Sequence, residues 1–117
     1  MIVLICGDRN WKDRSKIKRQ FLRVGPNKIS AVVQGMALGA DLLGGSCADE
    51  LGIPNIGIKA NWDFYHKAAG PIRNKWMITF IKVDEVWAFH SDLSKSKGTA
   101  DMVRQAKKAA IPVKVFT

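Results

Sequence analysis

Basic side chains recur at the points where helices are expected to follow strands. They fall in three pairs, which are Arg9 with Lys12, Arg73 with Lys75, and Lys95 with Lys97. The N-terminus of a helix carries partial positive charge, so it ordinarily favours Asp or Glu and disfavours Arg. A bound phosphate reverses this preference, because it accepts hydrogen bonds from free backbone N–H groups and from Arg or Lys together. The three pairs therefore predict an anion-binding site between the helix starts.

Two glycine-containing segments could contribute further donors to such a site. In SKSKGTAD, residues 94–101, Gly98 permits close backbone approach, Thr99 can cap a helix, and the hydroxyl and ammonium groups are donors. A flexible surface loop with an ordinary Thr cap is the alternative. In GMALGAD, residues 35–41, the two glycines match neither the dinucleotide fingerprint nor the P-loop, so a tight strand-to-helix turn explains them equally well.

Aromatic residues fill the segment NWDFYHK, residues 61–67. Trp62 and Tyr65 could stack on a base or cover a pocket. Phe64 is instead expected to join a small core beneath the loop, and His66 is expected to be a surface residue.

Five apolar runs are expected to form the strands that position these segments. They cover residues 1–6, 31–35, 54–60, 83–89 and 111–116. Helices are expected between them, and their strict alternation with strands predicts a doubly wound, Rossmann-like α/β domain. Its mostly parallel sheet of about five strands has helices on both faces. In such a sheet, ligands bind beyond the carboxyl ends of the strands, which is where the basic and aromatic segments fall.

Four helices are expected between these strands. The first is capped by Asn10, with Asp13 at the third helical position; the second covers residues 40–51; the third follows Pro71; and the fourth begins near Thr99. Their inward residues are predicted to be Ile17, Phe21 and Val24 in the first, Ala40, Leu43, Cys47 and Leu51 in the second, Ile72, Trp76, Met77 and Phe80 in the third, and Val103, Ala106 and Ala110 in the fourth.

The charge balance favours an anionic partner. The 117 residues, expected to form one domain over 1–117, include 19 Lys and Arg against 10 Asp and Glu, a net charge of +9. A solvated basic surface is an equal explanation. The first helix carries six of these cations, Lys12, Arg14, Lys16, Lys18, Arg19 and Arg23, which could hold a nucleic-acid backbone or form the solvated side of an amphipathic helix.

The other composition signals are negative. Cys6 and Cys47 lack C-x-x-C spacing and are expected to be buried free thiols, and no metal site or cofactor is expected. The apolar run at residues 1–6 is too short for a signal segment or a membrane span, so a cytoplasmic protein without membrane contact is expected.

Four segments carry a resemblance to a known family. They are GDRNWKD, GMALGADLLGGSCADELGI, ANWDFYHKAAGPIRNKWM and SKGTADMVRQAKKAAIPVKVF, in order over nearly the whole chain. They resemble the YspA-type, YpsA-related branch of the SLOG superfamily, and W-x-x-Y-x-K-A-A-G-P-I-R-N-x-x-M is the most specific part. The resemblance implies a Rossmann-like fold that binds nucleotides or nucleotide-derived ligands, in bacteria or their phages.

The wider superfamily includes the LOG-type phosphoribohydrolases, which use an R-K-x-x-M helix and a P-G-G-x-G-T-x-x-E loop. Arg73, Asn74 and Met77 resemble the first motif, with Asn in place of Lys. Gly98 and Thr99 match the second, whose Pro-Gly-Gly falls on the residues SKS at 94–96 and whose catalytic Glu falls on Met102. A thioether cannot act as a general acid or base, and this departure speaks against hydrolysis of an N-glycosidic bond. If the chain is such an enzyme, Asp101, Asp41 and Asp8 are the candidate acids.

The leading prediction is a domain that binds a nucleotide or nucleotide-derived phosphorylated ligand, as a sensor, sequestering protein or carrier. The residues predicted to contact the ligand are Gly7, Asp8, Arg9, Trp11, Gly35, Gly39, Asp41, Trp62, Tyr65, Arg73, Asn74, Lys97, Gly98 and Thr99. The alternatives are a nucleoside-monophosphate N-glycosidase and nucleic-acid binding through the basic first helix. The resemblance also implies a homo-oligomer, a dimer or higher, for which Trp76 or Met36 could serve.

Overall fold

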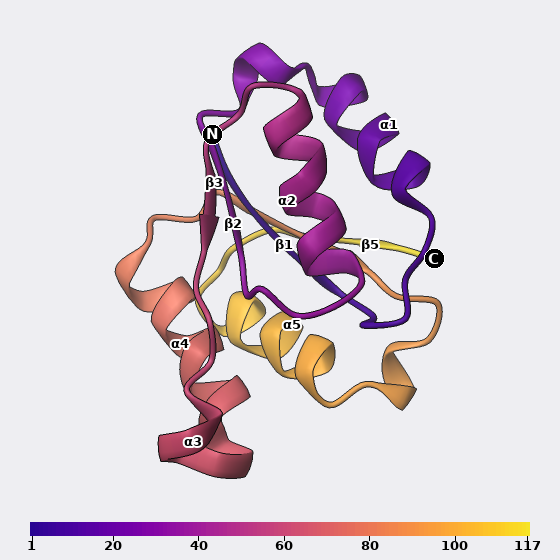
Figure 1. The fold of residues 1–117 in the computed structure, drawn as a ribbon. Coiled ribbons are helices and arrows are strands. Elements are labelled where there is room, and N and C mark those ends of the chain that lie inside the picture. Colours follow the sequence, from indigo (N-terminus) through magenta and orange to yellow (C-terminus); the bar gives the residue numbers. More distant parts are fainter.

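The five apolar runs form five strands in the computed structural model, which describes residues 1–117. The strands are β1 (Ile2–Gly7), β2 (Ala31–Gln34), β3 (Asn55–Gly57), β4 (Glu85–Phe89) and β5 (Val113–Phe116). They make one sheet in the order β3-β2-β1-β4-β5, and every neighbouring pair is parallel (Figure 1). The predicted Rossmann-like α/β fold with a parallel sheet is therefore confirmed.

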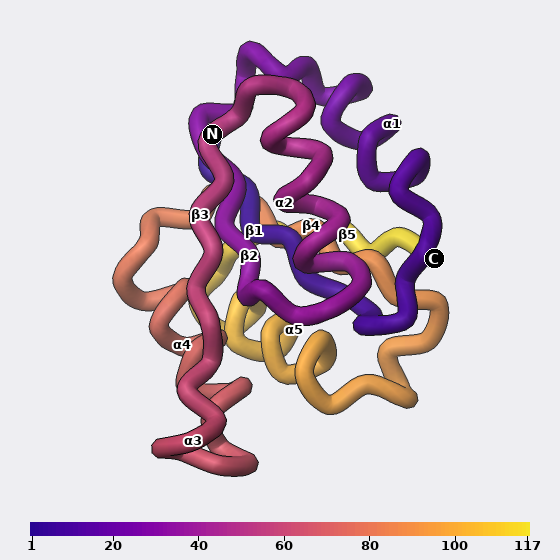
Figure 2. Tube along the Cα trace, in the orientation of Figure 1, coloured from indigo at the N-terminus to yellow at the C-terminus, as the bar shows by residue number.

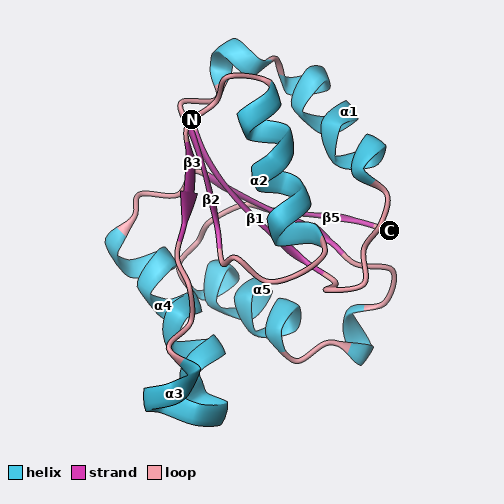
Figure 3. Ribbon diagram, in the orientation of Figure 1, coloured by secondary structure: helices cyan, strands magenta, loops and turns pink.

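The helices cover both faces of this sheet (Figure 3). The helices on the sheet are α1 (Arg14–Val24), α2 (Ala40–Glu50), α4 (Ala69–Phe80) and α5 (Gly98–Lys108), and a short helix, α3 (Trp62–Tyr65), lies away from it. Single 3-10 turns lie at Pro26–Lys28, His66–Ala68 and Leu93–Lys95. Helices α1 and α2 pack on one face, whereas α4 and α5 pack on the other.

Side chains of the central strand, β1, point alternately to the two faces of the sheet, and the core therefore has two layers. Val3 and Ile5 of β1 are buried against α1 and α2, whereas Leu4 and Cys6 are buried on the face of α4 and α5. Successive side chains of a strand point to opposite faces, so a strand covered on both faces must be apolar throughout. This requirement explains why β1 could be recognised as an uninterrupted apolar run.

The strand order places a topological switch point at the centre of the sheet. From β1 the chain moves outward in one direction to β2 and β3, and then returns to place β4 and β5 on the other side of β1. The loops that leave β1 and β4 therefore diverge to opposite faces, and ligands of open α/β sheets bind in the crevice that such divergence creates. This geometry identifies the carboxyl ends of β1 and β4 as one place to look for a site.

The first helix begins later than predicted, and Asn10 is not its cap. Asp13 is the N-cap, with its Oδ1 accepting a hydrogen bond of 3.0 Å from the backbone N–H of Lys16. The segment between Gly7 and Asp13 is instead a loop, in which the Asn10 N–H donates to Asp8 Oδ1. The predicted capping box was wrong because Asp13 supplies the cap itself.

Helix α4 begins before Pro71, at Ala69, so Arg73 is the fifth helical residue and does not lie in the first turn. Pro71 is accepted there because the first N–H groups of a helix need no partner within it. Two predicted core residues of this helix, Trp76 and Phe80, are 54% and 66% exposed and pack on each other with ring centroids 4.3 Å apart. Met77 is buried as predicted.

Helix α5 begins at Gly98, close to the predicted start at Thr99. Its buried apolar residues include Val103 and Ala106, as predicted, and Met102. Ala110 is exposed, because the helix ends at Lys108 and Ala110 adopts a φ of 59° in the turn that follows.

The chain after β3 leaves the body of the molecule before α4 returns to the sheet. Figure 2 shows this segment running to α3, which lies on the far side of the molecule from α1. Each of the helices is too short or too polar for a bilayer crossing.

Candidate functional site

Arg73 joins two of the loops at the carboxyl edge of the sheet. Its Nη1 donates to the carbonyl oxygen of Gly35, just after β2, at 2.5 Å, and to that of Ile58, just after β3, at 3.5 Å. Its Nε donates to Asn74 Oδ1 at 3.1 Å. The remaining nitrogen, Nη2, makes no hydrogen bond within the chain, so it can donate to a ligand. Burial lowers the pKa of Arg73 from its ordinary value, and a partly desolvated guanidinium interacts strongly with an anion.

Asp41 lies across Gly35 from this guanidinium, in the first turn of α2. Its Oδ2 accepts hydrogen bonds from the N–H groups of Gly35 at 3.1 Å and Ala37 at 3.3 Å. Burial raises the pKa of Asp41 to about 6, although both hydrogen bonds and the charge of Arg73 act in the opposite direction. The Gly35 N–H is thus already occupied by the protein's own carboxylate.

Gly35 is required between these two charged groups. A Cβ at this position would collide with the guanidinium of Arg73 and would lie 2.9 Å from Asp41 Oδ2. Any side chain would therefore displace Arg73 or Asp41. The close approach of Arg73 and Asp41 explains the first glycine of the GMALGAD segment, Gly35. The rest of the segment is a turn that leads into α2.

Asn74 and Asp101 connect α4 to α5. Asn74 is 4% exposed, and its Nδ2 donates to the Gly98 carbonyl oxygen at 3.3 Å and to Asp101 Oδ2 at 3.0 Å. Asp101 also accepts from Gln105 at 2.8 Å and from Arg104 at 3.2 Å. Three side chains therefore hold the Asp101 carboxyl group in place, and through Asn74 it orients α4 against α5.

The loops after β1 and β2 are in direct contact. The Asp8 carbonyl oxygen accepts from the N–H of Ala40, the first residue of α2, at 3.1 Å, and Gly39 lies against the backbone of Asp8 and Arg9. Arg9 itself is exposed. Arg73 links the loops after β2 and β3, and its neighbour Asn74 binds Gly98 in the segment after β4. Predicted residues that follow β1, β2, β3 and β4 therefore gather at one edge of the sheet.

The remaining predicted residues differ in what they can offer to a ligand. Trp11 is half-buried, packs on Phe89 at 5.8 Å between ring centroids and donates its indole N–H to the Asp13 carbonyl oxygen. Thr99 is buried and lies inside α5, where its N–H donates to Ser96 Oγ at 2.9 Å. Lys97 is exposed at the start of α5.

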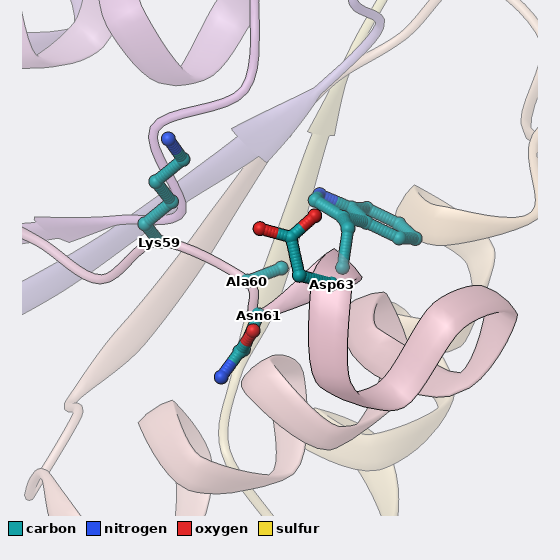
Figure 4. Close-up of a pocket in the computed structure, with 5 residues that line it drawn as sticks. Lys59, Ala60, Asn61 and Asp63 are labelled. Atoms are coloured by element: carbon teal, nitrogen blue, oxygen red, sulfur yellow. The ribbon is translucent and has the colours of Figure 1, made fainter.

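The aromatic segment after β3 forms one side of a pocket of about 390 Å³, which is lined by Lys59, Ala60, Asn61, Trp62 and Asp63. Figure 4 shows Lys59 on the loop after β3 and Asp63 on α3, on either side of this pocket. Trp62 is 52% exposed and Tyr65 is 42% exposed, so part of each ring is accessible to a ligand. Phe64 is 70% exposed, so the predicted small core beneath the loop was wrong.

His90 was not predicted as a site residue, yet it follows β4 directly and is 8% exposed. Its Nε2 lies 4.0 Å from Asp8 Oδ2, and its Nδ1 accepts from the backbone N–H of Asp92 at 3.0 Å. The sequence signal that could have found it is its position: Asp8 and His90 each stand immediately after a strand, and the two strands flank the switch point.

The basic face of α1 is partly neutralised within the molecule. Arg14 and Lys18 both pair with Glu50 of α2, at 2.9 Å and 3.0 Å, and Lys16 donates to the carbonyl oxygen of Thr117. Three cations of this helix region, Lys12, Arg19 and Arg23, remain exposed. The free positive surface is therefore smaller than the count of Lys and Arg suggested.

The parallel sheet and the polar residues gathered at its carboxyl edge define a Rossmann-like α/β protein. The chain belongs to the YspA, cpYpsA-related SLOG family, whose model matches residues 1–65. It is 34% identical over 119 residues to Gene 61 protein of Mycobacterium phage D29, an alignment that covers 95% of this chain and 92% of the phage protein.

Structural comparison supports the fold. DNA processing protein A (DprA) from Streptococcus pneumoniae superimposes with a TM-score of 0.72 at 18% sequence identity, over 97% of this chain. The match spans about half, 49%, of the DprA chain. At this identity the likeness concerns the arrangement of helices and strands alone.

Proposed function

We propose that this protein binds a nucleotide or a nucleotide-derived phosphorylated ligand at the carboxyl edge of its sheet, in a sensor, sequestering or carrier role. The observation that carries the proposal is the state of Arg73. Its guanidinium is half-buried and oriented by three acceptors, and Nη2 is left uncommitted at the edge where this fold binds ligands. An oriented, partly desolvated guanidinium is well suited to a phosphate.

The surroundings of Arg73 supply the other parts of a nucleotide site. Ile58, which accepts from Arg73, precedes Lys59, the first lining residue of the pocket described above. The pocket of about 390 Å³ is an open depression lined by one continuous stretch of the chain, with room for part of a small ligand. The exposed ring of Trp62 offers a face against which a group attached to the far side of the phosphate could pack.

The test is titration calorimetry with AMP, GMP, CMP and UMP against the wild-type protein and two variants. Arg73→Lys keeps a positive charge that can reach the Gly35 carbonyl but removes Nη2, so we expect it to weaken binding by tenfold or more, about the value of a charge-assisted hydrogen bond. Lys75→Ala, which removes an exposed cation of the same helix, is the matched control and should bind normally. The absence of binding by any nucleotide, or equal binding by Arg73→Lys, would overturn the proposal.

A second function, cleavage of the base–ribose bond of a nucleoside monophosphate, is favoured by Asp41. A carboxyl group whose pKa is raised to about 6 by burial can exchange a proton near neutral pH, as a general acid must. Incubation of the four nucleotides with protein, followed by chromatography, would reveal free base. For this function we expect release that is lost in Asp41→Asn and kept in Asp101→Asn, and release that persists in Asp41→Asn would exclude Asp41 as the acid.

A further inference from the structure

Asp8 and His90 form a polar pair at the switch point of the sheet. Asp8 follows β1, His90 follows β4, and these strands are neighbours in the ladder. Asp8 is held by a hydrogen bond of 2.9 Å from its N–H to the Phe89 carbonyl oxygen, and His90 by one of 2.9 Å to the Phe116 carbonyl oxygen. The backbones of both residues are therefore held by extensions of the sheet, which fixes the points from which their side chains start.

Gly7 is needed to bring Asp8 into this position. A Cβ on Gly7 would collide with the Phe89 carbonyl oxygen and would lie 2.7 Å from the Ala40 Cβ, and its φ of 156° lies outside the range that other residues readily adopt. The end of β1 thus passes between β4 and the start of α2 in a space that only glycine fits.

The hydrogen-bond partners of the pair leave one donor and one acceptor facing each other. His90 Nδ1 accepts from the Asp92 N–H, which assigns the hydrogen of the neutral imidazole to Nε2. Asp8 Oδ1 accepts from the Asn10 N–H at 2.8 Å, while Oδ2 has no donor. The 4.0 Å between Nε2 and Oδ2 is too long for a hydrogen bond, so the two atoms lie close together without bonding to each other, on side chains that are 9% and 26% exposed.

A hydroxyl group, of water or of a ligand that displaces the water, can complete this arrangement. A hydroxyl oxygen accepts from one partner and donates to the other, and it can stand about 2.8 Å from both Nε2 and Oδ2. A phosphate oxygen cannot serve as well, because it would only accept and would be repelled by the Asp8 carboxylate. The switch point therefore suits a neutral hydroxyl, whereas the anionic part of a ligand suits Arg73.

We propose that Asp8 and His90 bind a ribose hydroxyl of the nucleotide and select ribonucleotides over their deoxy forms. The inference rests on the proposed function, in which Arg73 binds the phosphate. Arg73 lies between the ends of β2 and β3, and the pair lies between those of β1 and β4, so the two positions are separated by two strand spacings, about 10 Å. A phosphate and its attached ribose, with a hydrogen bond at each end, can span this interval.

The experiment compares AMP, GMP, CMP and UMP with their 2′-deoxy and 3′-deoxy forms in wild-type protein and in His90→Asn. The Asn Oδ1 replaces His90 Nδ1 as the acceptor for the Asp92 N–H, but the variant lacks the Nε2 donor. We expect the wild type to bind the ribonucleotide about tenfold more tightly than one of the two deoxy forms, and His90→Asn to bind both almost equally. Asp8→Asn should also lose the discrimination, while Arg73→Lys should weaken all forms alike.

The outcomes separate the two proposals. Binding that depends on Arg73 but does not distinguish ribose from deoxyribose would overturn the role of Asp8 and His90 and leave the proposed function standing. Discrimination that persists in His90→Asn would do the same. The absence of any nucleotide binding would overturn the proposed function, and the hydroxyl subsite with it.

Discussion

At the scale of residues, the burial of Asp41 predicts that the stability of the protein depends on pH. The pKa of Asp41 is raised from 3.8 to about 6, chiefly by burial. Between these values the folded protein binds more protons than the unfolded chain, so the free energy of unfolding falls as the pH rises through this window and is level above it. In Asp41→Asn this contribution is absent. We expect wild type to lose about 2 kcal/mol relative to Asp41→Asn between pH 4 and 7, measured by urea denaturation.

Asp49→Asn, at an exposed position of the same helix, is the control for the loss of one negative charge. It should leave the pH dependence of wild type unchanged. A wild type and an Asp41→Asn variant with parallel stability profiles would show that the Asp41 carboxyl group is not desolvated.

Residue types alone could identify Arg73 and the glycines around it, but not what each of them contacts. Arg73 was predicted from a helix-dipole argument, whereas its position is set by the carbonyl oxygens of Gly35 and Ile58. His90 was missed because it comes near Asp8 only when β1 and β4 are neighbours in the sheet. The two residues themselves are 82 positions apart in the sequence. Local patterns carry no information about such a pair until the strand order is known.

At the scale of elements, the start of α1 offers a direct test of which residue caps it. Asp13→Ala should lower the free energy of unfolding by about 1 kcal/mol, because the Lys16 N–H loses its acceptor. Asn10→Ala should change it by less than about 0.5 kcal/mol, since Asn10 is an exposed loop residue. Thermal or chemical denaturation of the two variants measures the difference, and a larger effect of Asn10→Ala would restore the cap expected from sequence.

Helix α4 shows why the inward face of a helix can be misjudged from sequence. Its apolar residues occupy more than one side, so the spacing of Trp76 and Phe80 fits a buried stripe as well as that of Met77 does. Only packing against α5 decides between them, and it buries Met77 and leaves the two aromatic residues exposed. Self-association through helices, for which Trp76 or Met36 could serve, stays a prediction.

At the scale of the whole molecule, fewer unpaired cations lie on α1 than the sequence and its net charge of +9 suggested. With Arg14 and Lys18 paired to Glu50, the exposed cations Lys12, Arg19 and Arg23 could contact about three phosphates. We expect any DNA association through this helix to weaken with salt, with a log–log slope no steeper than roughly −3. Fluorescence anisotropy of a labelled duplex at several salt concentrations measures it.

The double variant Arg19→Glu and Arg23→Glu is the companion measurement. It should abolish that association without affecting nucleotide binding, because α1 is distant from Arg73. A much steeper slope, or DNA binding that survives the charge reversal, would indicate another nucleic-acid surface.

The fold was predictable because the alternation of buried strands and helices is a strong, repeated signal. Runs such as residues 1–6 and 83–89 must be apolar throughout when both faces of a parallel sheet are covered, and their order along the chain leaves few topologies. The weakest prediction concerned β3, which shrinks to three residues because it is an edge strand with Ile56 exposed. Side chains at the edge of the sheet are less buried than those at its centre, so the sequence of an edge strand need not be apolar throughout.

The same edge strand depends on α4 for part of its order. Arg73 reaches from that helix to the carbonyl groups that follow β2 and β3, so loosening of the helix removes a restraint from the end of a strand that has a neighbour on one side only. Fraying of the helix and detachment of the strand are thereby made cooperative, as one sub-global opening unit. Arg73 thus links the end of an edge strand to a helix that packs on one face of the sheet, so the strand and the helix are expected to gain or lose protection from hydrogen exchange together.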